Sequence, residues 1–487
     1  MLKLSSRFDL TLDLVRRVAW GGEKVELTME ARNKIAQRRA TFEALLANQS
    51  SHGVYGVNQG QGEMIRYRMT DVQMERLARL KPFPAAVSFG DYFPERVVRA
   101  MVLARFANIL NGHAFSTSRL ADGLIDMLND GEMPQVACSG QGGAGEILAL
   151  YPLFADFSKK FDLEAGERST LINGAPGGAA LLADATIAAR RRLKLVQEVL
   201  ALAIAAFGAP REHYDLALGE LWGGAHHVSA FQELGLLLGS ADEGPGKRSH
   251  QARVSYRIVP AVLGHAHWAV GQAEQIAATT LPSVTHNPTY FEPDAQYPYG
   301  HCISTGGFHN ALAAPLIDGL TGVWADLCLL AERLCAGLLN GRASGFPDFL
   351  LPERDIGESD GHGALGYLPM AIAGFVEEAR SLAQRSFIPA SDGSIFGQDD
   401  VASPVFLAWP KEAKAGQLVD RSLAILAVTA SQALHLTNRQ VASADLRRLL
   451  DLVRQVVPPV VADRVLGPDL QALSARFTAR VLDSVHR

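Results

Sequence analysis

Long stretches of helical periodicity are the feature that most constrains how this chain can fold. The chain has 487 residues, and after Asn173 and Gly174 apolar residues recur with helical spacing over much of the rest of it. The expected long helices comprise Ala179 to Phe207, Gly264 to Thr280, Asn310 to Leu339, Leu365 to Gln384 and Lys414 to Thr437. Several exceed the mean helix length of about 11–12 residues. The pattern therefore predicts a mainly α fold built around a long-helix bundle.

The part of the chain before these helices is more broken up by glycine and polar residues. Its clearest expected helices are Thr11 to Arg17, Met29 to Leu46 and Glu95 to Asn111. We therefore expect a smaller N-terminal part that carries loops, residues 1–165, and a bundle core, residues 166–487. Two more stretches, Ser283 to Gly307 and Asn340 to Gly363, are expected to be irregular, and loops this long in a compact protein are usually functional.

Composition and charge exclude several classes of function. The net charge of −5 gives no sign of nucleic-acid binding, which usually shows a strongly basic face. The basic run Arg190 to Arg192 is expected on a solvated helix face or at a subunit salt bridge. Residues Met1 to Leu10 lack the apolar core of a secretory signal. No charge-free apolar run reaches the ~20 residues needed to span a membrane.

The four cysteines form no C-x-x-C pair, and such sparing use of cysteine fits a reducing compartment. Together with the absence of a signal segment, this predicts a cytoplasmic protein that binds neither nucleic acid nor membrane. The histidines, among them His226, His227, His286, His301 and His309, match no zinc spacing and no H-E-x-x-H pattern. We therefore expect no metal.

Tyr55 lies in the glycine-rich segment Val54 to Gly62, which contains three glycines within seven residues. A tyrosine on such a loop can reach into a cleft and act as an acid or base if its pKa is lowered. The alternative is a tyrosine that packs a turn against the core, which from spacing alone is the more common case.

A second glycine-rich loop, Ser139 to Glu146, leads into an expected helix. Free N–H groups at a helix N-terminus can hold an anion or a developing oxyanion, which makes Gly142, Gly143, Ala144 and Gly145 candidates. A simple turn is the alternative. The loop lacks the Lys-Ser/Thr ending of a nucleotide-binding P-loop. Arg257 is a third candidate, because arginine can hold a carboxylate by two parallel hydrogen bonds, although most such arginines are only surface charge.

Seven segments, in order along the chain, together resemble one family. They are Leu10-Thr11-Leu12 with Val25-Glu26-Leu27, Tyr55-Gly56-Val57-Asn58, Leu171-Ile172-Asn173-Gly174, Gln251 with Ser255-Tyr256-Arg257, Thr285-His286-Asn287-Pro288, Ser304 to His309, and Gln398-Asp399-Asp400. The family is that of the histidine, phenylalanine and tyrosine ammonia-lyases and the related aminomutases. The resemblance extends from about Leu10 to Leu436.

This resemblance implies an ammonia-lyase-like (fumarase/aspartase-like) fold and a homotetramer whose active sites are built from several subunits. It implies catalytic roles for Tyr55, Asn173 and Asp399, with Asp399 in place of the longer acid of the family. It implies substrate-binding roles at four positions, which are Gln251, Arg257, Phe308 and Ala85. Ala85, with Pro84, stands where the family has a Ser-His pair, and Val254 stands where the family has a second catalytic tyrosine.

The largest departure concerns the family's prosthetic group, 4-methylideneimidazole-5-one (MIO), which forms from an internal Ala-Ser-Gly. When the chain is aligned on Glu146, the tripeptide here is Gly143-Ala144-Gly145. Ala144 has no hydroxyl to eliminate, so the electrophilic methylidene cannot form by that route. We therefore expect no MIO and no other cofactor.

Three hypotheses follow. The first is a MIO-independent lyase or isomerase that acts on a small, carbonyl-activated substrate by addition, elimination or cyclisation next to the carbonyl. The substrate would be free or bound to a carrier. The second is a non-catalytic member of the family that serves as a small-molecule-binding or regulatory scaffold. The third is an ordinary ammonia-lyase in which the loop is misaligned, so that MIO forms despite Ala144.

Overall fold

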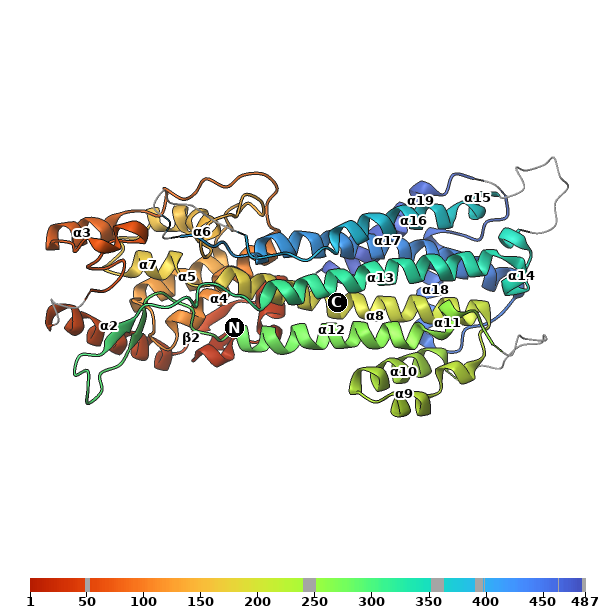
Figure 1. Cartoon of the computed structure of the whole chain (residues 1–487), viewed down its shortest axis with the longest axis horizontal. Helices are drawn as coiled ribbons and strands as arrows, with labels where there is room; N and C mark the ends of the chain where they lie inside the picture. Colours follow the sequence, from red (N-terminus) through yellow and green to blue (C-terminus); the bar gives the residue numbers. More distant parts are fainter. Residues whose placement is uncertain are drawn as a thin grey trace.

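The computed structural model describes residues 1–48, 53–239, 251–351, 363–389, 397, 399–462 and 464–483. The molecule is elongated, with the N-terminal part at one end and long helices extending from it to the other end (Figure 1). The prediction of a mainly α fold with a long-helix bundle is confirmed.

Five helices form the bundle. They are α8 (Pro176–Phe207), α12 (Val259–Thr280), α13 (Ala313–Leu339), α16 (Leu368–Leu382) and α17 (Val405–Thr437). All of them except α16 have at least 22 residues. Helix α13 packs against all four of the others, and α17 also packs against α8 and α16. Proline at the first position of α8 fits a helix start, and Gly208 ends the helix in the left-handed conformation, with φ of 73°.

The expected helices differ from the observed ones mainly at their ends. Helix α17 begins at Val405, nine residues before the expected Lys414. Pro410 lies inside this added segment, where the sequence pattern alone favours a break. Helix α8 likewise starts at Pro176 and not at Ala179.

The described N-terminal part consists of helices of at most 20 residues and a small sheet. The helices are α1 (Leu12–Val15), α2 (Met29–Asn48), α3 (Asp71–Arg79), α4 (Glu95–Ile109), α5 (Ser118–Asp130), α6 (Ile147–Lys159) and α7 (Glu167–Ile172). Strands β1 (Leu2–Leu4) and β2 (Val25–Leu27) pair in parallel, with Leu2 opposite Val25. Helix α4 packs on α8 and thereby joins this part to the bundle.

The segment Ser283 to Gly307 is not wholly irregular, so that prediction is wrong in part. It contains β3 (Thr289–Phe291) and β4 (His301–Ile303), which form an antiparallel pair. Strands of three residues are too short to show a readable alternation in the sequence. The other expected loop contains the short helix α14 (Gly341–Ser344) and a 3-10 turn, Asp348–Leu350, while residues 352–362 lie outside the described part.

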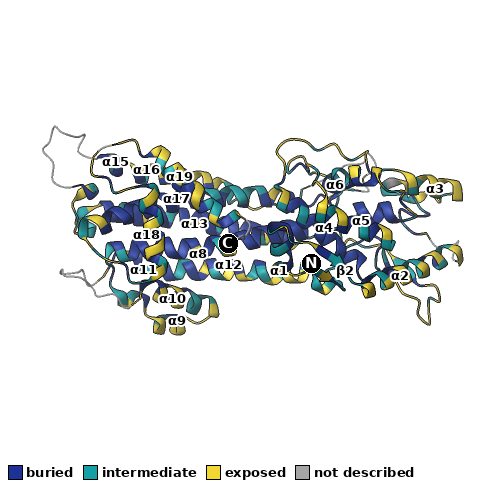
Figure 2. Ribbon diagram, turned by 180° about the vertical axis from the view of Figure 1, so that it is seen from behind, coloured by how far each residue is buried: buried dark blue, intermediate teal, exposed yellow. Residues whose placement is uncertain are grey.

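Further helices surround the far half of the bundle. They are α9 (Leu216–Trp222), α10 (Ala225–Leu238), α11 (Val254–Arg257), α15 (Gly363–Gly366), α18 (Ala444–Val456) and α19 (Gly467–Leu482). Buried residues run along the inner faces of the long helices, and exposed residues lie on the periphery (Figure 2). One hydrophobic cluster includes residues from both parts of the chain, so the division at 165/166 stays a prediction.

Helix α13 has the length and apolar character of a membrane-crossing helix, with a mean hydropathy of 1.4 over 18 residues. In this structure 67% of that stretch is buried, and the helix packs against α8, α12, α16 and α17. These contacts are those of a core helix.

The basic run Arg190 to Arg192 is not simply a solvated face. Arg192 is fully buried and pairs with Asp420, with 2.9 Å between Nε and Oδ1. Arg191 donates to the carbonyl oxygens of Val481 and Asp483. The helical pattern shows which positions share a face, but it does not show that a partner carboxylate comes from α17, 228 residues further along the chain.

Candidate active site

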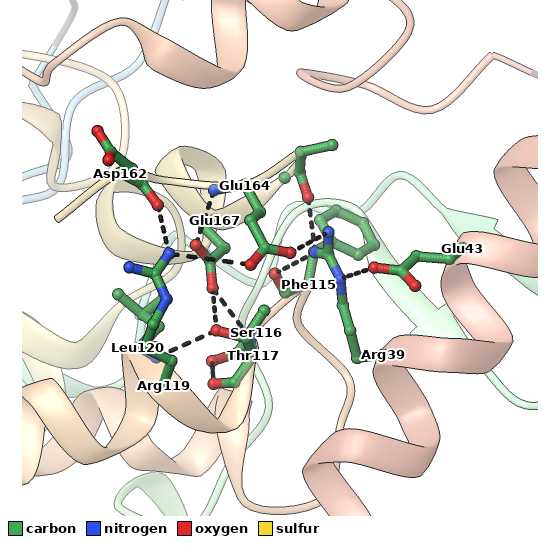
Figure 3. Close-up of polar contacts among 12 residues, drawn as sticks. Arg39, Glu43, Phe115, Ser116, Thr117, Arg119, Leu120, Asp162, Glu164 and Glu167 are labelled. Carbon is green, nitrogen blue, oxygen red and sulfur yellow. Dashed lines mark hydrogen bonds and ion pairs between the residues drawn. The ribbon is translucent and has the colours of Figure 1, made fainter.

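A polar network fixes the position of α7 against α2 and the start of α5 (Figure 3). Arg39 of α2 donates to the carbonyl oxygens of Phe115, at 3.2 Å, and Ala165, at 2.8 Å. The carboxylate of Glu167 accepts hydrogen bonds from the N–H of Thr117, at 3.0 Å, and from its hydroxyl, at 2.6 Å. These bonds hold the N-terminal end of α7, a helix of six residues that leads directly to Asn173.

Asn173 directly follows α7, and its amide Nδ2 donates to Ser169 Oγ at 2.7 Å. Its carbonyl oxygen accepts a hydrogen bond from Arg105, which is fully buried on α4. Nε and Nη2 of Arg105 have no hydrogen-bond partner among the described residues. Burial lowers the pKa of Arg105 to about 9. A costly buried cation therefore lies directly behind Asn173.

The glycine-rich loop before α6 meets the N-terminus of α8. Glu146, the residue just before α6, is fully buried, and its two carboxylate oxygens accept hydrogen bonds of 2.5 Å from the N–H groups of Gly177 and Gly178. Burial raises the pKa of Glu146 to about 7, although these N–H groups favour the charged form. The sequence interpretation had used Glu146 only as an alignment anchor, and its place after a glycine-rich loop was the available signal.

The N–H groups of Gly142 to Gly145 form no hydrogen bond within the described part of the chain. Gly145 adopts φ of 59°, which favours glycine, and a Cβ there would lie 3.2 Å from Phe308 Cδ2. The loop can therefore approach the ring of Phe308 closely and still offer N–H groups to a ligand.

Tyr55 lies on a tight turn that folds back onto itself. Gly56 has φ of 70°, and the N–H of Gly62 donates to Tyr55 Oη at 2.8 Å. Burial is the largest cause that raises the pKa of Tyr55, and the nearby Asp399 raises it further. A lowered pKa, the condition for Tyr55 to act as a base, is therefore not met in this chain by itself, and the phenol is protonated at neutral pH.

These elements together enclose a cavity of about 420 Å³. Six of the residues predicted from the sequence line it, namely Tyr55, Ala144, Gly145, Asn173, Phe308 and Asp399. One Asp399 carboxylate oxygen lies 3.6 Å from the place of a Cβ on Gly62, which puts Asp399 beside the Tyr55 turn. Gly142 and Gly143 belong to the same loop but do not line the cavity.

Further residues in the lining were not predicted as site residues. They are Gln61, Gly62, Ile65, Glu146, Ile147, Tyr151, Ile172, Gly174, Asn287, Ser304, Thr305 and Gly306. Oδ1 of Asn287 accepts hydrogen bonds from Ser304 Oγ, at 3.2 Å, and from the N–H of Thr305, at 3.0 Å. The motifs around Asn287 and Ser304 were visible in the sequence, whereas nothing in the pattern of α6 distinguished Tyr151.

Arg257 and Gln251 do not line this cavity. Arg257 lies in α11, at the far end of the bundle from α6 and α7 (Figure 1). The intervening α12 has 22 residues and so spans about 33 Å. Arg257 Nε donates to the carbonyl oxygen of Ala252 at 3.0 Å. A single chain therefore does not bring Arg257 to the cavity.

Ala85 is also absent from the lining, although its segment passes close to the glycine-rich loop. Ser88 Oγ donates to the carbonyl oxygen of Gly140 at 3.1 Å, and Ser139 Oγ donates to that of Phe89 at 2.9 Å. The segment therefore flanks the loop without facing into the cavity.

The residues at the MIO position do not fit that group. Ala144 lines the cavity with a methyl group, which has no oxygen to lose. The serine of the same loop, Ser139, is exposed, and its hydroxyl is bound to Phe89 on the flanking segment.

Among the histidines, His286 has structural surroundings. His286 is fully buried, its Nδ1 lies 2.6 Å from the carbonyl oxygen of Pro288, and burial lowers its pKa to about 4. Among the described residues, no group of three His, Cys, Asp or Glu side chains lies close enough to hold a metal ion.

Comparison with known proteins identifies the family. The sequence pattern described as aromatic amino acid lyase matches residues 10–155 and 155–455, and the chain belongs to this family. A histidine ammonia-lyase from Deinococcus radiodurans is 28% identical over 97% of this chain and 93% of its own length. The family thus makes this chain a lyase-type enzyme related to histidine ammonia-lyases.

Two solved structures share the fold. Ergothionase from Treponema denticola, described as an ergothioneine-degrading enzyme, has a TM-score of 0.88 at 19% identity, covering 99% of both chains. Tyrosine aminomutase from Streptomyces globisporus has a TM-score of 0.84 at 22% identity, covering 97% of this chain and 95% of its own. At these identities the likeness concerns the fold alone.

Proposed function

We propose that this chain is a MIO-independent lyase or isomerase. It adds to, or eliminates across, a carbon–carbon bond next to the carbonyl of a small substrate, with ring closure as one form of the addition. One observation carries the proposal: Tyr55, Asn173 and the glycine-rich loop border one cavity, while Ala144 occupies the cofactor position. An acid–base group and an oxyanion site are enough for a substrate that brings its own carbonyl activation.

The residues divide the work by their chemistry. Tyr55 begins the reaction protonated in the empty site and exchanges a proton with the substrate carbon or the leaving group. Asn173 and the free N–H groups of the loop stabilise the negative charge that develops on the carbonyl oxygen. In addition to burial, the nearby Asp399 raises the pKa of Tyr55. The ring of Phe308 packs against the apolar part of the substrate.

A second copy of the chain completes the site in this proposal. Arg257 and Gln251 lie about 33 Å from the cavity along α12, yet the family resemblance gives both a substrate-binding role. In a homotetramer, Arg257 of another copy would reach the cavity and bind a substrate carboxylate by two parallel hydrogen bonds. The glycine-rich loop and Tyr55 would come from the first copy. We propose that this assembly is cytoplasmic.

The substrate is small and derived from an amino acid. Support for this comes from a relative named as a histidine ammonia-lyase and from a structural neighbour that degrades ergothioneine. Whether it is free or bound to a carrier depends on access to the cavity in the assembled protein.

Proton exchange in heavy water, followed by NMR, tests this proposal. The full-length protein is incubated with aromatic amino acids, their enoates and β-hydroxyacyl thioesters, beside a Tyr55→Phe variant. Deuterium incorporation or a new product that depends on Tyr55 supports the proposal. No exchange with any compound, together with tight binding of one of them, would instead favour the non-catalytic scaffold.

A further inference from the structure

Tyr151 is a second phenol in the lining of the cavity, and the proposed function gives it no role. It comes from α6, is partly exposed, and lines the cavity together with Tyr55. Burial is the largest cause that raises the pKa of Tyr55, and a negative charge on Tyr151 raises it further, so the two phenols interact. An elimination next to a carbonyl needs both a base and an acid. The cavity therefore contains a second group that can take one of these roles.

A buried arginine gives Tyr151 surroundings that favour negative charge. Arg168 of α7 is buried, and its Nη2 donates to Tyr151 Oη at 2.9 Å. Its Nη1 donates to Oε1 of Gln61, another residue of the lining. Both acceptors are uncharged, and within the described part of the chain Arg168 has no carboxylate partner. A guanidinium forms a stronger, charge-assisted hydrogen bond when the oxygen that accepts it is negative. Arg168 therefore stabilises a phenolate at Tyr151.

The surroundings of Tyr55 have the opposite effect. Tyr55 Oη accepts its hydrogen bond from a neutral donor, the N–H of Gly62, and Asp399 lies beside the same turn. Burial is the largest cause that raises the pKa of Tyr55, and Asp399 raises it further. Arg168 lowers that pKa, but its contribution is the smallest of those that act on Tyr55. Two groups of one kind in environments of different charge are suited to the separate roles of acid and base.

We infer that Tyr151 is the general base of the proposed reaction, that Arg168 is a positioning residue which stabilises the Tyr151 phenolate, and that Tyr55 is the general acid. This inference rests on the proposed function, because it assigns the two proton transfers of the same elimination. The phenolate removes the proton from the carbon next to the carbonyl, and that C–H electron pair forms the new carbon–carbon double bond. The electron pair of the bond that breaks departs with the leaving atom, which takes the proton of Tyr55. A proton then passes from Tyr151 to Tyr55 through solvent, so no oxidant or reductant is needed. Addition follows the same steps in reverse.

Arg168 also connects the elements that carry the two phenols. Because it donates to Oε1 of Gln61, the amide nitrogen of Gln61 faces the other way, and the place of a Cβ on Gly56 lies 2.7 Å from that nitrogen. Its other hydrogen bond holds Tyr151 of α6. Glu167, the residue before Arg168, is bound to the start of α5, which fixes this end of α7 (Figure 3). One guanidinium thus sets both the charge at the second phenol and the placement of the two phenols.

The ionisation of each phenol can be measured without a substrate. The full-length protein is labelled with tyrosine that carries carbon-13 at Cζ, and its NMR signals are followed from neutral to alkaline pH. Tyr151→Phe and Tyr55→Phe assign the two signals, with the exposed Tyr67→Phe as control. The Tyr151 signal should reach the phenolate position at a lower pH than the Tyr55 signal. Arg168→Met should move the Tyr151 transition upwards by about one pH unit or more, and Arg168→Lys, which keeps the charge, by less. Circular dichroism checks that each variant is folded.

Two results of this titration would overturn the inference. One is a Tyr55 signal that reaches the phenolate position before the Tyr151 signal in the native protein. The other is a Tyr151 transition that stays in place in a folded Arg168→Met variant. If Arg168→Met does not fold, the order of the two signals in the native protein and the size of the change in Arg168→Lys still decide the matter.

Heavy water separates the inference from the proposed function. For a compound that turns over, Tyr151→Phe should slow deuterium exchange at the carbon next to the carbonyl by about 100-fold or more. Tyr55→Phe should keep that exchange and lose product formation, because the oxyanion site stabilises the charge before the leaving atom departs. Exchange that is lost in Tyr55→Phe and kept in Tyr151→Phe would overturn this inference and leave the proposed function standing. Neither exchange nor product with any compound would overturn the proposed function, and the titration decides the Arg168–Tyr151 pair on its own.

Discussion

Two fully buried arginines, one in the bundle and one behind the cavity, have pKa values that are shifted in opposite directions. In the bundle, Arg192 lies 2.9 Å from Asp420 and 3.7 Å from Glu412. Although burial opposes its charge, these carboxylates leave the pKa of Arg192 raised. Behind the cavity, Arg105 donates to a backbone carbonyl, and burial lowers its pKa to about 9.

The contrast shows where the fold tolerates unpaired charge. A buried ion pair offsets much of the desolvation cost of its two charges. Arg105 has Glu146 nearby, yet the carboxylate of Glu146 is bonded to backbone N–H groups and not to Arg105. Burial also raises the pKa of Glu412 in the bundle to about 7, so a raised carboxyl pKa alone does not distinguish the bundle from the cavity region. Perturbed groups of opposite sign next to a cavity are a mark of a functional site.

The strongest test of this contrast concerns activity, because the cavity region is where the chemistry is placed. Tyr55→Phe removes the phenol that exchanges protons and should lower kcat by about 10²–10⁴-fold. The fold should survive, because only the hydrogen bond from Gly62 to Tyr55 Oη is lost. Steady-state kinetics measures the loss, with the exposed Tyr67→Phe as the matched control. Unchanged kcat in Tyr55→Phe would remove Tyr55 from the mechanism.

The free energy of unfolding tests the role of the Arg192 ion pair in the bundle. Arg192→Met leaves Asp420 and Glu412 without their partner and should cost about 3–5 kcal/mol of unfolding free energy. Arg105→Met removes a charge that no carboxylate binds directly, so its cost should be clearly smaller. Denaturant unfolding of both variants, followed by circular dichroism, gives the two values. An equal cost at the two positions would contradict the distinction between paired and unpaired charge.

Mixed assemblies test whether the two ends of the molecule meet across subunits. Arg257→Gln should lower kcat/KM by roughly 100-fold through loss of a charged hydrogen-bonding partner, while Arg253→Gln should have little effect. When the Tyr55→Phe and Arg257→Gln proteins are unfolded and refolded together, some sites receive both intact residues. The mixture should then regain part of the activity that each protein lacks alone. No recovery in a mixture shown to contain hybrid assemblies would place Arg257 outside the site.

The smallest expected effect is a pH trend in stability. Burial raises the folded pKa of Glu146 to about 7, so its stabilising contribution is complete below the unfolded pKa and is lost as pH rises through about 7. Glu146→Gln removes the titratable group and with it this pH-dependent loss. Relative to the native protein, the free energy of unfolding of the variant should therefore rise by on the order of 2 kcal/mol between about pH 5 and pH 8. Thermal unfolding across that range measures the trend, with the exposed Glu30→Gln as control. A constant difference at every pH would show that Glu146 does not titrate in this range.

The sequence predicted the bundle because long helices leave a periodic signal that short elements do not. The strands Thr289–Phe291 and His301–Ile303 escaped prediction for that reason, since three residues cannot show a pattern. At the site, Tyr55, Asn173 and Phe308 lay in recognisable motifs and are now found around one cavity. Tyr151 could not be found, because its exposure to the cavity depends on how α6 packs.

The place of Arg257 shows another limit of the sequence. The motif around Arg257 could be read in the sequence, but the structure places the residue in α11, away from the cavity. The burial of Arg192 was missed for a related reason, because its partners Glu412 and Asp420 lie on a helix far along the chain. Side-chain surroundings built from distant segments require the folded structure.

We propose that Ala144 leaves the chain without the prosthetic group, and intact mass spectrometry of the purified protein tests this directly. A mass equal to that of the encoded chain is predicted, because Ala144 has no hydroxyl to eliminate. A deficit of two waters, located by peptide mapping to residues 143–145, would show that the ring forms after all and would contradict the account.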